Sequence, residues 1–359
     1  MKSIMKKVIT GILVLLFFFF TSWFYKTIML MLIAIVWKKK IKTIRPWAFK
    51  ATLGVLAITL FWVTPRYRYD NGDRVRLIYQ DKDGNPMLPP LSHWLVNVLL
   101  PEEELCTLGI WGAAIAPEKT PFVGGWIYKD FIRDLKRGKI FNFYHPYSNL
   151  NWSGNFMMSG TTSQAFNMAG FEKTQSVYLI EPKDYDEDKS YPVVFFMHGY
   201  LGNWKLYNGI LNELDNCIVM GVGTDDLSGI FNQSDISQLF TKQIPFLEKM
   251  GYKPDMNNLH IIGLSNGGTA TNVAYNSFSR RFKSITFIST GIHQTYPISS
   301  KVLLIGGGKD PSSGSIPGAY RNLRNNGCKT DMFWKDDEGH FILVNQTDEI
   351  IDFINRNLK

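Results

Sequence analysis

Cysteine is scarce in this chain, and its three cysteines lie far apart. Cys106, Cys217 and Cys328 provide neither a disulfide framework nor a paired metal-binding spacing. This excludes cysteine-rich secreted scaffolds and zinc modules as classes of protein. Cys217 begins an apolar run and is expected in the core, so cysteine usage leaves the redox compartment open.

Acidic residues are nearly missing from the N-terminal part. Residues 1–76 hold 14 Lys and Arg but only 2 Asp and Glu, whereas the rest of the chain holds 25 and 29. The net charge of +8 therefore arises in the N-terminal part. Beside apolar sequence, such a charge indicates contact with a phospholipid bilayer and control of topology. No basic-aromatic motif stands out elsewhere, so nucleic acid is not an expected partner.

Two long apolar runs occupy the same basic region, at about 8–37 and 47–63. A helix needs about 20 residues to span a bilayer. The first run could form one tilted helix or a hairpin bent near Tyr25 and Lys26. No small-x-small cleavage site follows it, which disfavours a signal peptide. We therefore predict N-terminal transmembrane helices, an anchor of two or three spans over residues 1–63, in an integral membrane protein.

The orientation of this anchor depends on the number of spans. Residues 38–45 form a strongly basic loop that is expected to stay in the cytoplasm. With two spans, the charge count slightly favours a C-terminal domain on the inside. With three spans, that domain lies outside, and we expect it on the extracytoplasmic side.

Residues 64–170 are rich in aromatic residues and glycine, with turn signals at 70–72, 83–86 and 89–90. This part carries no visible repeat or low-complexity tract. We expect an irregular extension that packs on the C-terminal domain. Alternatively, it is a cap that shapes a substrate pocket or rests on the bilayer surface.

Residues 171–359 alternate apolar strand-like runs with helical segments. Such alternation is typical of an α/β fold with a mostly parallel sheet and helices on both faces. About 190 residues suffice to bury a core of their own. A final helix is expected near 346–357. The predicted strands are 175–181, 192–197, 217–222, 259–264, 284–289, 301–306 and 330–335.

One glycine-rich turn carries a central serine, Ser265. It lies between the apolar run 259–262 and a helix-like segment at 269–277. Strand, tight turn and helix are the context of a nucleophile elbow, in which a strained turn exposes the hydroxyl. Gly263, Gly267 and Gly268 are the elbow glycines, because side chains there would collide as strand and helix close on each other.

A serine nucleophile needs a base, and the base needs a carboxylate that fixes its tautomer. Asp310 follows the predicted strand 301–306, and His340 follows the strand 330–335. In a parallel sheet both loops reach the same edge as the elbow. Asp225 and Asp226 could supply the acid from another strand end instead. The acidic residues at 336–338 are expected to form a solvated loop.

The strand 192–197 ends in His198, Gly199 and Tyr200. A turn here can aim the backbone N–H of Tyr200 at the oxyanion of a tetrahedral intermediate. The second donor would be the N–H of Asn266, directly after the serine. The ring of His198 is expected to be structural.

These residues together resemble an α/β-hydrolase of the serine esterase type, over about 171–359. The matching features are His198-Gly199, Gly263-x-Ser265-x-Gly267-Gly268, Asp310 and Glu338-Gly339-His340. The resemblance implies a Ser-Asp-His triad. Glycines after the serine also occur in prolyl-oligopeptidase-like peptidases, so they do not separate esterase from peptidase.

We therefore expect a membrane-anchored serine hydrolase that cleaves carboxylic esters through an acyl-enzyme, with lipid or envelope-derived esters among the candidate substrates. This chemistry requires neither a metal nor an organic cofactor. A serine peptidase, an acyltransferase and a non-catalytic membrane scaffold on the same fold are the alternatives. The sequence does not identify the substrate.

Overall fold

The structure is a computed structural model of the whole chain. It describes residues 2–19, 23–63, 74–87, 129–130, 133–134, 137, 175–199, 204–224 and 230–358.

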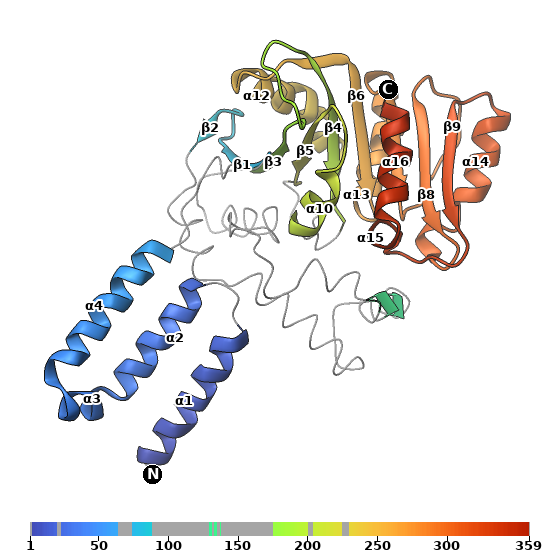
Figure 1. Cartoon of the computed structure of the whole chain (residues 1–359). Helices are drawn as coiled ribbons and strands as arrows, with labels where there is room; N and C mark the ends of the chain where they lie inside the picture. The colour runs from blue at the N-terminus through green and yellow to red at the C-terminus, as the bar shows by residue number, and fades with distance from the viewer. Residues whose placement is uncertain are drawn as a thin grey trace.

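A nine-stranded sheet runs through the part of the structure that follows the N-terminal helices (Figure 1). The strand order is β2-β1-β3-β5-β4-β6-β7-β8-β9. From β5 onward all neighbours are parallel, whereas β2, β1, β3 and β5 pair antiparallel. The expected mostly parallel α/β sheet is therefore found. The strands are β1 (Val75–Gln80), β2 (Pro86–Met87), β3 (Gln175–Ile180), β4 (Tyr191–Met197), β5 (Ile218–Val222), β6 (Pro254–Leu264), β7 (Ser284–Ile288), β8 (Lys301–Gly307) and β9 (Thr330–Lys335).

Continuous apolar runs form the central strands because both faces of the sheet are covered. In β4, Val193 and Phe195 face one buried cluster, while Val194 and Phe196 face the other. Each such side chain contributes about 1.5–3 kcal/mol of burial free energy. Alternate residues thus build two cores, one on each side of the sheet.

Helices cover both faces, as the sequence predicted. One core includes residues of α11 (Gln233–Gln238), α12 (Ile244–Lys249), α13 (Gly267–Phe278) and α14 (Ile316–Asn325). The other includes residues of α10 (Trp204–Leu211), α15 (Ile342–Asn345) and α16 (Thr347–Leu358). In α16, Ile350, Ile351 and Ile354 are buried at helical spacing, while acidic residues occupy the first turn.

Two short strands begin the sheet within the part of the chain that we expected to be an irregular extension. The whole of β1 pairs antiparallel with β3, and Tyr79 of β1 lies opposite Met87 of β2. The sheet therefore extends beyond the expected boundary near residue 171.

The N-terminal region forms the helices α1 (Lys2–Phe19), α2 (Trp23–Val36), α3 (Lys38–Ile44) and α4 (Pro46–Val63). Figure 1 shows α1, α2 and α4 side by side. The predicted spanning helices are not supported, because no helix among the described residues is long and apolar enough to cross a membrane. The apolar run 8–37 is divided between α1 and α2, and α1 carries three lysines.

Candidate active site

Ser265 lies between β6 and α13 with a left-handed backbone, φ 53°. A non-glycine residue in this region is strained, as expected at a nucleophile elbow. The backbone N–H of Ser265 donates to the Ile288 carbonyl at 2.9 Å, and its carbonyl accepts from the Gly268 N–H at 2.8 Å. These bonds hold the turn and leave the side chain half-buried at the end of the strand.

The elbow glycines are required by close approaches of the backbone. A Cβ at Gly263 would overlap the carbonyl of Gly267, and a Cβ at Gly267 would overlap the carbonyl of Met197. A Cβ at Gly268 would overlap the side chain of Thr290. The helix α13 can thus begin two residues after Ser265, with its first turn against the sheet.

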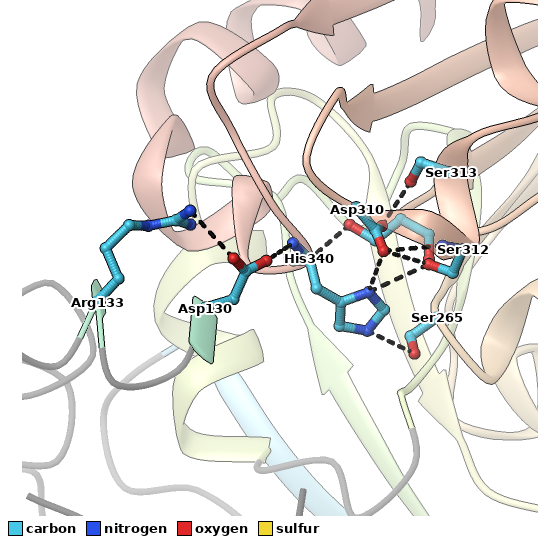
Figure 2. Close-up of polar contacts among 8 residues, drawn as sticks. Asp130, Arg133, Ser265, Asp310, Ser312, Ser313 and His340 are labelled. Carbon is cyan, nitrogen blue, oxygen red and sulfur yellow. Dashed lines mark hydrogen bonds and ion pairs between the residues drawn. The ribbon is translucent and has the colours of Figure 1, made fainter. Parts of the chain in front are cut away.

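The side chains of His340 and Asp310 meet Ser265 at the carboxyl ends of the strands (Figure 2). The Nε2 atom of His340 lies 2.9 Å from the Ser265 Oγ, and its Nδ1 lies 3.2 Å from Asp310 Oδ1. An ionised carboxylate only accepts, so Nδ1 carries the proton and Nε2 is free to accept from the serine hydroxyl. The geometry therefore suits proton transfer from serine to histidine.

Asp310 is buried, at 1% exposure, but well supplied with hydrogen-bond donors. Its oxygens lie 2.7 Å from the Ser312 Oγ and 2.6 Å from the Ser313 Oγ, and the Ser312 N–H donates at 3.1 Å. Burial raises the pKa of Asp310, but its interactions with His340 and the two serines outweigh burial and hold that pKa below its ordinary value. The carboxylate is therefore ionised at neutral pH.

Three supporting residues were not singled out from the sequence. The Ser312 Oγ lies 3.2 Å from His340 Nδ1 and 2.9 Å from the Ser289 carbonyl. The Ser289 hydroxyl donates to the His340 carbonyl at 2.8 Å. Asp130 accepts from the His340 backbone N–H (Figure 2). Asp-Pro-Ser-Ser at 310–313 carries a capping signal that could have indicated Ser312; Ser289 and Asp130 have no local signal.

The loop before His340 differs from its expected solvated form. Asp336 and Asp337 are exposed, but Glu338 is buried at 3% exposure. Its carboxylate accepts from the amides of Asn345 and Gln346 at 2.8 and 2.7 Å. The expectation was wrong for Glu338 because local amide donors satisfy a carboxylate that the sequence alone places in a charged run.

Asn266 lies between Ser265 and the first residue of α13. Tyr200, the other predicted oxyanion donor, lies outside the described residues, as do the alternative acids Asp225 and Asp226. The His198 ring contacts Phe231 at 5.3 Å between centroids, and its Nδ1 lies 2.7 Å from the Gly199 carbonyl. Neither contact involves Ser265.

The sheet order and the serine-bearing turn define an α/β-hydrolase-like protein. No protein-family model matches the sequence, and no curated protein matches it. Among solved structures, a thermostable esterase is similar at 20% identity and a TM-score of 0.40, over 51% of this chain and 59% of its own.

Two further solved structures are similar over 52% of this chain. An acylaminoacyl peptidase from Pyrococcus horikoshii has 16% identity, a TM-score of 0.41 and 40% of its own length covered. An esterase from the archaeon Pyrobaculum calidifontis has 14% identity, a TM-score of 0.43 and 81% covered. The chain thus spans less than two thirds of the thermostable esterase and of the peptidase. Function must be inferred from the geometry of the site itself.

Proposed function

We propose that the protein is a serine hydrolase that cleaves carboxylic esters. The observation that carries this proposal is the unbroken hydrogen-bonded chain from Ser265 through His340 to Asp310. The strained serine and the ionised carboxylate at its two ends support the same role.

In the proposed mechanism, His340 accepts the Ser265 proton as Oγ attacks the acyl carbonyl. Asp310 keeps the imidazole in the required tautomer and stabilises the imidazolium. The N–H groups of Asn266 and Tyr200 bind the oxyanion. His340 then protonates the leaving alcohol, and a water that it activates hydrolyses the acyl-enzyme. Every proton in this cycle passes through the Nε2 atom of His340.

The test is labelling of the full-length protein with a fluorophosphonate probe, beside Ser265→Ala. We expect labelling of the parent at Ser265 and none in the variant, and hydrolysis of p-nitrophenyl esters at least about 10³-fold slower in the variant. Asn266→Ala, which retains the backbone N–H, is the control for damage to the turn. A folded parent that does not react would favour the non-catalytic scaffold.

A peptidase or an acyltransferase would use the same residues. Matched ester and amide substrates with a common acyl group separate esterase from peptidase. Addition of an alcohol acceptor, with detection of the transferred acyl group, identifies an acyltransferase. The ester proposal predicts hydrolysis that is faster on the ester and not diverted by the acceptor.

We also propose that the N-terminal helices contact a phospholipid surface. Apolar side chains are exposed along α1 and α4, among them Ile4, Leu15, Val55, Ile58 and Phe61 at 62–68% exposure. Lysines at 38–40 of α3 are exposed as well. Together they fit an anionic membrane with a lipid or envelope-derived ester as substrate. The location of the site on the extracytoplasmic side stays a prediction. Protease accessibility in intact cells would test it.

A further inference from the structure

We propose that Asp130, from the part of the chain before the hydrolase domain, is a positioning residue for His340. This inference rests on the proposed function, in which His340 is the general base. Asp130 is 6% exposed, and its Oδ2 accepts from the backbone N–H of His340 at 2.5 Å. The two residues are 210 positions apart in sequence.

The backbone of His340 is held by hydrogen bonds at both its carbonyl and its N–H. Ser289, directly after β7 in the sheet, donates to its carbonyl. Asp130 accepts from its N–H. A charge-assisted bond to a backbone N–H is about twice as strong as a neutral one. The backbone of the base is therefore held by the sheet at one end and by Asp130 at the other.

Arg133 holds Asp130 in place. Its guanidinium lies 3.0 Å from Asp130 and 3.0 Å from the fully buried Asp134, and 4.0 Å from Glu338. Arg137 lies 3.9 Å from Glu338 as well. These ion pairs attach Arg133 and Arg137 to the loop that precedes His340, so several contacts hold Asp130 beside that loop.

Gly339 provides the space for this contact. A Cβ there would overlap the Asp130 carboxylate. The φ angle of Gly339 is not positive, so its backbone would accept alanine. The glycine before His340 is therefore required by the presence of Asp130 and not by its own conformation.

Asp130 affects catalysis through the distance between the His340 Nε2 and the Ser265 Oγ. Transfer of the serine proton requires Nε2 to stay within hydrogen-bond reach of Oγ, and a displacement of about 1 Å can reduce the rate about 100-fold. Asp130 touches neither the Ser265 Oγ nor the imidazole nitrogens in the contacts of the described residues. Its loss should therefore lower kcat and leave KM nearly unchanged.

The first experiment compares the full-length parent with Asp130→Ala, Asp130→Asn and Asp337→Ala. Asp337 is an exposed carboxylate on the same loop, so its variant controls for loss of charge. We expect kcat on p-nitrophenyl acetate and the rate of fluorophosphonate labelling to fall about 10–100-fold in Asp130→Ala, with KM changed less than about threefold. Asp130→Asn should recover part of the rate, because its amide oxygen still accepts from the His340 N–H but lacks the charge that strengthens this bond and pairs with Arg133. Asp337→Ala should match the parent.

A double-mutant cycle gives the second test. Gly339→Ala should reduce kcat in the parent, where the methyl displaces the carboxylate, and have little effect in the Asp130→Ala background. Additive effects would overturn the proposal, as would an equal loss in Asp130→Asn and Asp130→Ala. Thermal unfolding of each variant separates loss of positioning from loss of fold.

Hydrogen exchange of the peptide containing His340 provides a readout without activity. Asp130→Ala should increase exchange at this peptide, and Asp337→Ala should not. If the parent fails to react with the probe, the proposed function fails, yet increased exchange would still support the contact. A reactive parent with unchanged exchange and unchanged kcat in Asp130→Ala would overturn the positioning role alone.

Discussion

At the scale of single residues, the buried carboxylate of Asp310 makes a testable contribution to stability. Its interactions hold its pKa below the ordinary 3.8 in the folded state, so the folded protein binds this proton less readily than the unfolded chain. The stabilisation is present above pH 3.8 and is lost as the pH falls through the folded-state pKa. We expect Asp310→Asn to unfold at a lower temperature than the parent at about pH 7, and the difference to narrow in acid. Thermal unfolding at both pH values measures it. A difference that widens in acid would contradict the assigned sign.

The residues of the site differ in how far the sequence could predict them. Ser265, Asp310 and His340 each follow a strand of a parallel sheet, and that topology brings their loops to one edge. Their proximity is thus a consequence of local patterns that can be read separately. Asp130 follows no such pattern, because its position depends on an ion-pair cluster formed with a distant loop. Ser289 lies directly after β7 with nothing in the local sequence to mark it, and only the packed structure shows its bond to His340.

At the scale of elements, the junction of β6 and α13 depends on a glycine that packs against backbone. Gly267→Ala would place a methyl group on the Met197 carbonyl, which cannot move without disturbing β4. We expect a loss of about 1–3 kcal/mol in the free energy of unfolding. Gly318, within α14, has open space within 4 Å of the position that an alanine methyl would take. Its replacement by alanine should stabilise by about 0.5–1 kcal/mol. Urea unfolding of both variants provides the comparison, and equal effects would be inconsistent with close packing at the elbow.

Strands and helices of the C-terminal part can be predicted because each is marked by an unbroken run of apolar or periodically spaced apolar residues. Buried strands such as 301–306 are apolar runs, and the final helix expected near 346–357 is found as α16 at Thr347–Leu358. The sequence does not reveal the short strands β1 and β2, because turn signals flank both strands and β2 has only two residues. The long apolar run at 8–37 predicts membrane spans from its hydropathy and the basic charge around it, and neither shows where one helix ends and the next begins.

At the scale of the whole molecule, net positive charge and exposed apolar surface are both concentrated in the N-terminal region. The described C-terminal strands bury nearly all their apolar side chains, whereas α1 and α4 expose theirs. The sheet thus buries its own apolar side chains, whereas the apolar surface of the N-terminal helices requires an apolar environment to cover it. An anionic membrane meets both requirements, since lysines attract its headgroups and apolar side chains enter the acyl boundary.

This proposal predicts how the full-length protein distributes between buffer and lipid vesicles. In flotation assays, we expect binding to phosphatidylcholine vesicles that strengthens when anionic phosphatidylglycerol is included and weakens in high salt. The combined variant Val55→Ser, Ile58→Ser and Phe61→Ser should bind at least about tenfold more weakly, because it removes apolar area from the contact. Ile230→Ser with Met256→Ser changes exposed apolar residues of the C-terminal part and should bind like the parent.

Replacement of Lys38, Lys39 and Lys40 by glutamine separates the electrostatic part of this contact from the apolar part. Each lysine near an anionic surface contributes about 1 kcal/mol, so this variant should lose the preference for phosphatidylglycerol and keep its weaker binding to phosphatidylcholine. Vesicle binding that is unchanged by both sets of substitutions would contradict a lipid contact through these helices.

Release of the protein from membranes by alkaline carbonate is expected for a surface contact. Retention would contradict it, because only a polypeptide inserted through the acyl layer resists that treatment.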